Sequence, residues 1–292
     1  MHLFFKMPTT RNASRRRMYW ATWFGLSMMK NAESVSMAAD DAAKELELTF
    51  RFYSLLNDFL PVWKRQKEIK KAFGKHTTLK DAIESFGVPH TEIGLILCNS
   101  LPATFEQKVI DGALVSVFPH FKTIDVGKLA PILFERPKQF KFILDVHLGT
   151  LARYLRLLGF DTLYNNSYSD EQLADIAYAE ERILLTRDPG LLKRKKVKQG
   201  YFVRAIEPRL QAIEILREFH LKEKLHPFGR CLRCNGLLQS VNKIEIKNVV
   251  PPKVSETQSS FLKCQRCGRI YWPGSHYHRM KALVLWLKLH AY

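Results

Sequence analysis

The alternation of apolar and polar residues predicts a first folded unit that begins near Leu46. Residues 46–52 alternate with the period of a half-buried strand, and a basic segment follows at 64–75. Thr78 is placed to cap a helix that ends before Gly87. Apolar runs at 95–99 and 113–118 add two more strands. This order predicts a β-grasp domain over residues 46–126.

The pattern changes after a linker at 127–138, which contains Pro131 and Pro137. Strands now alternate with helices, as expected for a parallel, doubly wound sheet over residues 139–225. The strands are predicted at 140–144, 161–164, 182–186 and 201–203, and the helices at 148–158, from the capping box Ser169-Asp170-Glu171-Gln172 onward, and at 209–219.

Two of these strands end in an aspartate, Asp145 and Asp188. Parallel strands end at the same edge of a sheet, which is where ligands bind. Asp170 and Glu171, at the start of a helix on that edge, are further candidates, and Asp175 is a weaker one. Clustered carboxylates favour Mg²⁺ or Mn²⁺, and such a site hydrolyses phosphodiesters. The alternatives are helix capping by Asp170 and Glu171 and a turn at Asp188.

Four of the five cysteines form two C-x-x-C pairs. Cys231, Cys234, Cys264 and Cys267 therefore predict a closed, structural zinc site in a ribbon with a C-terminal helix over residues 226–292. A redox dithiol is the alternative. Residues 249–252 are interpreted as a loop or edge strand. Cys98, in an apolar run, is predicted to be a core residue.

The net charge of +18 points to a polyanionic partner, with nucleic acid first and anionic membrane second. Residues 138–292 hold 27 basic and 14 acidic residues, whereas residues 1–137 hold 19 and 14. Candidate RNA contacts are Arg156, Lys193, Arg194, Arg233, Arg266 and Trp272. The alternatives are solubility for the charge as a whole, a solvated face for residues 193–198, and packing inside the ribbon for Trp272.

Residues 1–45 are rich in arginine and are interpreted as a basic, dispensable tail of a cytoplasmic protein. An organellar transit peptide is the alternative, and upstream sequence before a later start is another. The apolar stretch at 18–29 falls short of the roughly 20 residues that span a bilayer, so no membrane association is expected.

Two motifs carry a resemblance to a known family. Residues 145–162, DVHLGTLARYLRLLGFDT, and residues 182–188, RILLTRD, closely resemble the Mut-seven C-terminal RNase family. The resemblance extends from about Phe140 to Met280 and includes the zinc segment. It implies a PIN-like, metal-dependent nuclease fold, with Asp145 and Asp188 as metal ligands and Asp170 as the third.

The same resemblance assigns supporting roles to basic residues. Arg153, Arg156 and Arg187 match motif positions and are candidates for phosphate contact, with structural pairing to the acids as the alternative. His276 is a candidate to assist near the scissile phosphate, or to hydrogen-bond within the fold.

The first domain resembles the ubiquitin-like domain that is often fused to this family. The similarity rests on residues 78–99, on Asp111-Gly112 and on Phe118-Pro119. Sulfur carriers are distantly similar, but they work through a free Gly-Gly terminus that this domain does not have. A docking or stabilising module is therefore expected, with a protein partner as the alternative.

Together these features predict a ribonuclease that uses Mg²⁺ or Mn²⁺ for catalysis, Zn²⁺ for structure and single-stranded RNA as substrate. The alternatives are a non-catalytic RNA- or ribosome-binding protein and an interaction adaptor that uses its ubiquitin-like domain. DNA as the substrate is a variant of the first hypothesis.

Overall fold

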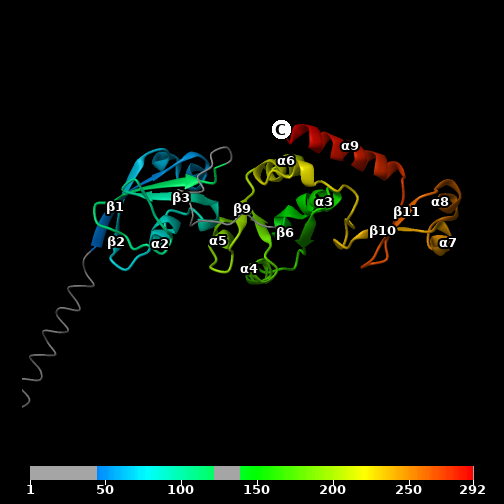
Figure 1. Ribbon diagram of the computed structural model, residues 1–292, viewed down its shortest axis with the longest axis horizontal. Coiled ribbons are helices and arrows are strands. Elements are labelled where there is room, and N and C mark those ends of the chain that lie inside the picture. The colour runs from blue at the N-terminus through cyan, green and yellow to red at the C-terminus, as the bar shows by residue number, and fades with distance from the viewer. Residues whose placement is uncertain (1–44, 122–138, 292) are drawn as a thin grey trace, which may run out of the picture. The chain divides into compact units, whose positions relative to one another are not determined.

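The computed structural model describes residues 45–121 and 139–291 (Figure 1). The predicted basic tail and the predicted linker at 127–138 lie outside these residues. The chain divides into two units, residues 1–45 and residues 46–292. No helix among the described residues is long and apolar enough to cross a membrane.

The N-terminal domain is a five-stranded β-grasp sheet with the strand order β2-β1-β5-β3-β4. Strand β3 runs antiparallel to both of its neighbours, β4 and β5, while β1 and β5 are parallel. The elements are β1 (Glu45–Phe52), η1 (Ser54–Phe59), η2 (Val62–Lys64), β2 (Glu68–Gly74), α2 (Leu79–Glu84), η3 (His90–Glu92), β3 (Ile93–Cys98), β4 (Leu101–Pro102) and β5 (Leu114–Pro119).

The predicted helix cap is present, since the Asp81 backbone N–H donates to the Thr78 hydroxyl at 3.1 Å. Helix α2 packs with the inner faces of β1 and β5 in one apolar core that also contains Cys98, as predicted. The segment read only as basic contains strand β2. Its lysines lie at exposed or half-buried positions while Ile69 and Phe73 point into the core.

The second domain is a four-stranded, fully parallel sheet with the order β7-β6-β8-β9. Its strands match the predicted runs. The central strands β6 and β8 are almost wholly buried, as expected for a parallel sheet covered on both faces, and the edge strands β7 and β9 are partly buried. The elements are β6 (Lys141–Leu144), η4 (Val146–Leu148), α3 (Gly149–Leu157), β7 (Asp161–Tyr164), α4 (Asp170–Ala179), β8 (Ile183–Thr186), α5 (Pro189–Leu192), β9 (Gly200–Phe202), α6 (Pro208–Glu218) and η5 (Lys222–Lys224).

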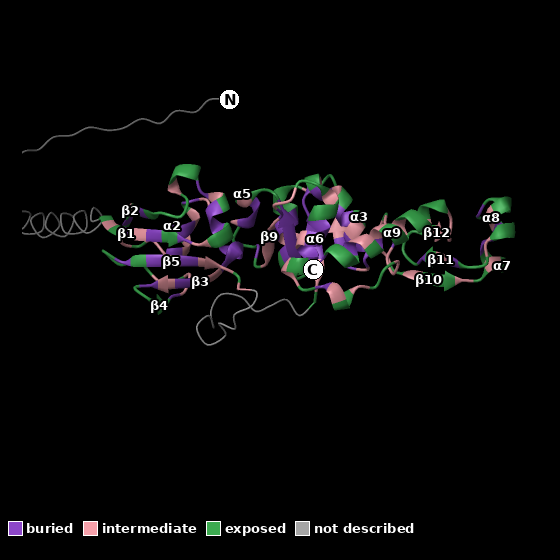
Figure 2. Ribbon diagram, turned by 90° about the horizontal axis from the view of Figure 1, so that it is seen from above, coloured by how far each residue is buried: buried purple, intermediate pink, exposed green. Residues whose placement is uncertain are grey.

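Helices cover both faces of this sheet, as the doubly wound prediction requires (Figure 1). Helices α3 and α6 pack on the face that carries Phe142 and Leu185, and α4 and α5 pack on the face that carries Ile143 and Leu184. The buried residues gather in the middle of this domain, in strands β6 and β8 and on the helix faces that pack on them (Figure 2). The predicted capping box is formed, with Ser169 and Gln172 bonding each other's backbone N–H.

The C-terminal segment is a three-stranded antiparallel ribbon followed by a long helix. Its elements are β10 (Leu238–Val241), α7 (Lys243–Ile246), α8 (Pro252–Thr257), β11 (Phe261–Cys264), β12 (Ile270–Tyr271) and α9 (Ser275–His290). Residues 249–252, predicted as a loop or edge strand, form no strand. Residues 249–251 form the loop alternative of this prediction and connect α7 to α8, and Pro252 begins α8, a position where proline is favoured.

Candidate functional site

The carboxyl edge of the parallel sheet brings Asp145 and Asp188 to one place. Strands β6 and β8 pair in register, with Leu144 beside Leu185, so each strand ends at the same level. The Thr186 hydroxyl donates to Asp145 Oδ2 at 2.8 Å and accepts from the Asp188 backbone N–H at 3.0 Å. One buried threonine therefore connects the two predicted acids, and the side chain of Asp145 is itself buried.

The other predicted acids have partners of their own. Asp170 starts helix α4 and lies 3.6 Å from Arg194 Nη2. Asp175, further along α4, pairs with Lys196. Glu171 is exposed. Among the described residues, one group of three or more His, Cys, Asp or Glu side chains has its ligand atoms close enough together to share a metal ion. That group is the four cysteines. Asp145, Asp170 and Asp188 do not form such a group in this side-chain arrangement.

Local hydrogen bonds hold the carboxylates of Asp145 and Asp188 in their present orientations. Asp145 Oδ1 accepts from the Val146 backbone N–H, and Asp188 Oδ1 accepts from the Gly190 backbone N–H at 2.7 Å as the cap of α5. Asp145 and Asp188 thus each satisfy a backbone N–H at the start of a short helix, whereas the capping alternative had named Asp170 and Glu171. The donor set still suits a hard cation, since a carboxylate has about four lone-pair sites and these bonds use only some of them.

The predicted arginines differ in what they contact. Arg153 is exposed on α3, and Arg187 is exposed and donates to the carbonyls of Arg204 and Ala205. Arg156 is 4% exposed. Its guanidinium donates to the carbonyls of Thr162, Leu232 and Arg233 at 2.9–3.1 Å. Arg156 therefore holds the first cysteine knuckle on α3 and is not placed for the RNA or phosphate contact predicted for it.

The remaining predicted contact residues lie at or near the surface. Arg194, Arg233, Arg266 and His276 are exposed, and Lys193 and Trp272 are half-buried. The predicted solvated face at 193–198 is mostly exposed, but Val197 is fully buried. Trp272 packs partly against a small apolar cluster of the ribbon that contains Phe261.

The four predicted zinc ligands converge in the ribbon. Their sulfurs all lie within 4.8 Å of one another, with Cys231 to Cys267 at 3.7 Å and Cys234 to Cys264 at 3.4 Å. A tetrahedral zinc ion with Zn–S bonds of about 2.3 Å places its sulfurs roughly 3.8 Å apart. The cluster therefore fits structural zinc. Gly236 is required beside it, because a Cβ there would lie 2.9 Å from Cys264 Sγ.

The ionisation of the four cysteine thiols also favours binding of a cation in the cluster. Burial alone would raise the pKa of Cys231, but hydrogen bonds from the Tyr271 hydroxyl and from backbone N–H groups lower it to about 6. Burial and the neighbouring thiols raise the pKa of Cys234 to about 12. Adjacent thiols cannot all ionise by themselves, and a divalent metal that deprotonates all four resolves this repulsion.

Two family models match the chain. One, described as the Mut7-C RNAse domain, matches residues 140–284, and the other, described as Mut7-C ubiquitin, matches residues 45–125. The chain carries a Mut7-C ubiquitin domain followed by a Mut7-C RNAse domain. Comparison with curated proteins and with solved structures gave no significant match. The predicted resemblance is confirmed, and the RNAse-domain match includes the cysteine ribbon and most of α9.

The Mut7-C RNAse domain holds its ribbon through a polar joint at Asp161, the first residue of β7. Asp161 Oδ1 accepts from Arg182 Nη1 at 2.6 Å and from Asn235 Nδ2 at 2.8 Å, and Asp161 Oδ2 lies 3.5 Å from Arg230. Burial alone would raise the pKa of Asp161, but these hydrogen bonds and the arginine charges outweigh it and hold the pKa below 3.8.

We expect Asp161→Asn to lower the free energy of unfolding by about 2 kcal/mol at neutral pH, since a hydrogen bond to a charged group contributes roughly 1.5–3 kcal/mol. The carboxylate's contribution is complete above its unfolded pKa of 3.8 and is lost as the pH falls through the lower folded pKa. Urea unfolding at about pH 7 and about pH 3 should show the difference shrinking in acid. Asp175→Asn, which removes an exposed pair, should change stability by less than about 1 kcal/mol at both.

The Mut7-C ubiquitin domain contacts the edge strand β9. Glu92 Oε1 accepts from the Phe202 backbone N–H at 2.7 Å, and Glu92 Oε2 pairs with Arg204 Nη2 at 2.7 Å. Arg204 also reaches Asp58 at 3.1 Å. Burial raises the pKa of Glu92, although the charge of Arg204 acts in the opposite direction. The carboxylate satisfies an edge N–H that would otherwise be open to pairing with another chain.

Sequence reasoning missed Thr186 and the pair formed by Glu92 and Arg204. Thr186 was detectable, because it is a polar residue that ends an otherwise apolar, fully buried strand. The pair had no local signal, since its two members lie 112 positions apart.

Proposed function

We propose that this chain is a metal-dependent ribonuclease that hydrolyses RNA phosphodiester bonds at the carboxyl edge of its parallel sheet. The observation that carries the proposal is the connection of Asp145 to Asp188 through Thr186, within a domain that matches the Mut7-C RNAse family. Nuclease-type function follows from the family match, whereas the catalytic metal and the roles of single residues are proposed.

The proposed site uses hard oxygen ligands. Asp145 and Asp188, with Asp170 as the third acid, would hold Mg²⁺ or Mn²⁺, which activates water and stabilises charge on the phosphate and the leaving oxygen. Thr186 fixes the orientation of the Asp145 carboxylate by donating to Oδ2. To serve as the third ligand Asp170 would turn away from Arg194, a half-exposed contact of 3.6 Å that contributes little.

Basic side chains of the chain would position the RNA. Arg187 lies directly between Thr186 and Asp188 in sequence, and two backbone carbonyls fix its guanidinium. Arg153 is exposed on α3. Both are placed in the motifs that carry the two aspartates, where a phosphate contact would orient the scissile bond. Glu171 and His276 remain auxiliary candidates.

A cleavage assay tests the proposal. Labelled single-stranded RNA and DNA of the same sequence are incubated with the full chain in Mg²⁺, in Mn²⁺ and without added divalent metal. EDTA is avoided because it would also remove zinc. We expect RNA cleavage only with added metal, giving 5′-phosphate or 3′-phosphate ends from attack by water. Cyclic 2′,3′-phosphate products formed without metal would instead indicate attack by the ribose hydroxyl and contradict the proposal.

A second function is supported by a separate observation, the charge of the ribbon. A non-catalytic RNA-binding protein would use the ribbon and leave the acids as helix caps, consistent with the local bonds of Asp145 and Asp188. Tight RNA binding with no cleavage in either metal would favour it. The ubiquitin-like domain is proposed as a stabilising module in both cases, because Glu92 caps the β9 edge.

A further inference from the structure

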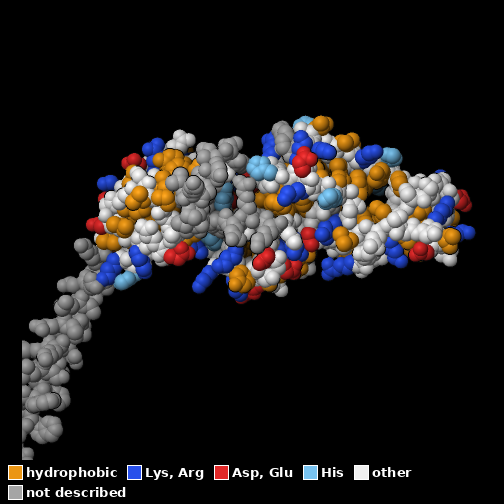
Figure 3. Space-filling model, in the orientation of Figure 1, with side chains coloured by type: hydrophobic (Ala, Val, Ile, Leu, Met, Phe, Trp, Pro, Cys, Tyr) orange, Lys and Arg blue, Asp and Glu red, His pale blue; other side chains and the backbone are white. Residues whose placement is uncertain are grey.

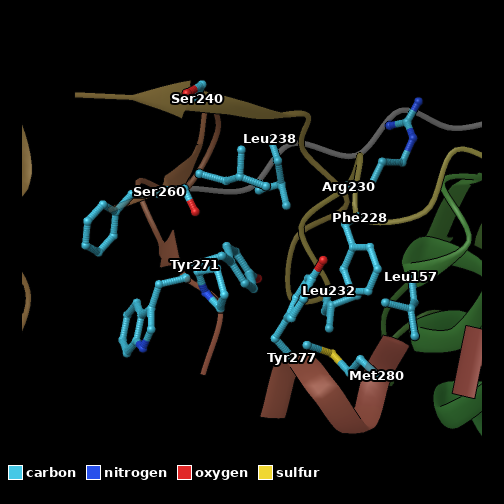
Figure 4. A pocket seen from close by; sticks show the side chains of 14 residues that line it. Leu157, Phe228, Arg230, Leu232, Leu238, Ser240, Ser260, Tyr271, Tyr277 and Met280 are labelled. Carbon is cyan, nitrogen blue, oxygen red and sulfur yellow. The ribbon is translucent and has the colours of Figure 1, made fainter. Parts of the chain in front are cut away.

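A pocket of about 250 Å³ lies between the ribbon and the parallel-sheet domain (Figure 4). Its lining includes the aromatic residues Phe228, Tyr271, Trp272 and Tyr277, together with Met280. Figure 4 shows Tyr277 and Met280 on α9, with Phe228 beside them and Tyr271 on the side of the ribbon. The pocket is separate from the carboxylate edge, since neither Asp145 nor Asp188 lines it.

The pocket lies where two apolar clusters meet without filling the space between them. Phe228, Tyr277 and Met280 belong to or adjoin α9, and Phe228 and Met280 pack against the main core of the sheet domain. Trp272 packs against the small ribbon core. Protein interiors are normally close-packed, so an open space with aromatic walls between two cores has the character of a ligand site.

The walls of the pocket favour a flat ring with a polar edge. The Phe228 and Tyr277 rings are 4.8 Å apart and tilted by 40°, which presents an aromatic surface for stacking. The exposed serines Ser240 and Ser260 line the same pocket with hydroxyl groups. Its volume is slightly below the roughly 300–1,000 Å³ typical of pockets for drug-sized ligands. A single nucleobase has this size and chemistry.

The positive charge around the pocket favours a negatively charged ligand such as a nucleic-acid strand. Residues 226–292 hold 11 Lys and Arg against two acids, Glu245 and Glu256. Both acids lie in the insertion between the two cysteine pairs, in α7 and α8. On the face seen in Figure 3, basic side chains lie along the ribbon, and acidic side chains are visible towards its outer end, where α7 and α8 lie. Lys263, Arg279 and Lys281 are exposed and adjoin lining residues in sequence.

One lining arginine has a structural task instead. Arg230 donates to the carbonyls of Gly159 and Asn235 and lies 3.5 Å from Asp161. Its guanidinium therefore fixes the wall of the pocket, and phosphate contact falls to the exposed lysines and arginines around it.

We propose that this pocket binds one unpaired base of the RNA, stacked among Tyr277, Phe228 and Trp272, while the surrounding cations hold the flanking phosphates. The inference rests on the proposed function, because it names how that substrate is recognised. Only a base that is not in a duplex can enter, so the pocket makes the protein selective for single strands.

The test separates the base from the backbone. Full-length protein with bound zinc, carrying Asp145→Asn to prevent cleavage, is titrated in Mg²⁺ with a labelled single-stranded RNA and with an oligomer of the same length whose central residues are abasic. Both oligomers carry the same phosphates. We expect the base-bearing RNA to bind at least about fivefold more tightly, the lower end of what one stacked base contributes.

Substitutions assign this preference to the pocket. Tyr277→Ala and Trp272→Leu should reduce the affinity ratio of the two oligomers to about one, whereas Trp63→Leu should not change it. Trp63 is a suitable control because it is an exposed tryptophan of the ubiquitin domain, at 68% exposure. Arg279→Gln should weaken both oligomers equally, as a phosphate contact does. Zinc content and thermal unfolding are measured for each variant. If Trp272→Leu loses zinc, the test rests on the result for Tyr277→Ala.

Equal binding of the two oligomers by the parent protein would overturn the proposal, and so would a folded Tyr277→Ala variant that keeps the full ratio. These results are distinguishable from failure of the proposed ribonuclease function. If the protein cleaves RNA but binds the two oligomers with equal affinity, it is a ribonuclease that does not use this pocket for a base. If it never cleaves RNA but its affinity ratio depends on Tyr277, it is an RNA-binding protein that uses the pocket.

Discussion

Asp145→Asn is expected to reduce metal-dependent RNA cleavage by more than about 100-fold. Even outer-shell partners of metal ligands typically contribute about 10–100-fold, and Asp145 is proposed as a ligand itself. Asparagine keeps the shape of aspartate and can still accept the Thr186 hydroxyl, but it removes the negative charge that attracts the cation. Single-turnover cleavage of labelled RNA in Mn²⁺ measures the loss, since Mn²⁺ binds more readily than Mg²⁺ to a site that has lost one of its oxygen ligands.

Stability supplies an independent readout for the same variant. Asp145 is only 8% exposed, and it lies at the same sheet edge as Asp188. The two carboxylate oxygens of Asp145 accept from the Val146 backbone N–H and the Thr186 hydroxyl, and asparagine keeps one acceptor oxygen, so the variant should unfold at a somewhat lower temperature than the parent while remaining folded and keeping its zinc. Thr186→Val, which removes the hydroxyl that orients Asp145, should lower cleavage by about 10–100-fold.

Asp175→Asn is the matched control for the carboxylate. It removes a charge from α4, the helix that also carries Asp170, but its partner Lys196 lies on the surface. Cleavage should stay within about twofold of the parent, because an exposed pair contributes little. If Asp145→Asn cleaved as fast as Asp175→Asn, the carboxyl edge would not be the active site and the RNA-binding alternative would gain ground.

The parallel sheet was predictable because its signals are local. The central strands β6 and β8 are short apolar runs that are almost wholly buried, and each helix has a cap or a period of its own, such as the Ser169 capping box. The convergence of Asp145 and Asp188 followed from the shared edge of parallel strands. Strand β2 was missed because Lys70 and Lys71 interrupt the apolar alternation of Ile69 and Phe73, and charged residues of this kind are typical of an edge strand.

The features that sequence could not provide depend on contacts between distant segments. Arg156 lies at a position of the family motif where a phosphate contact was predicted. Its guanidinium instead donates to three backbone carbonyls, two of which belong to the first cysteine knuckle. The docking of Glu92 on β9 and the pocket beside Tyr277 likewise arise where independently predicted units meet. Local periodicity describes each unit and carries no information about such junctions.

The second large effect is expected from the zinc site. Cys264→Ser should reduce bound zinc from one ion per chain to none and unfold the ribbon, because structural zinc contributes roughly 10–16 kcal/mol to small domains that depend on it. Cys264 is 1% exposed and ends strand β11, so its loss also disrupts the pairing of β10 with β11. Metal analysis of the purified protein and hydrogen exchange over residues 230–272 measure the two effects.

Cys98→Ala is the control, since Cys98 is buried in the core of the ubiquitin domain and contacts no metal ligand. It should keep one zinc per chain and protected ribbon amides. Full zinc content in Cys264→Ser would contradict the four-thiolate site. Because Arg156 and Asp161 hold the first knuckle on the sheet domain, zinc loss should also raise hydrogen exchange in α3. The metal would then stabilise the junction that forms the base pocket, and RNA affinity should fall together with the zinc content.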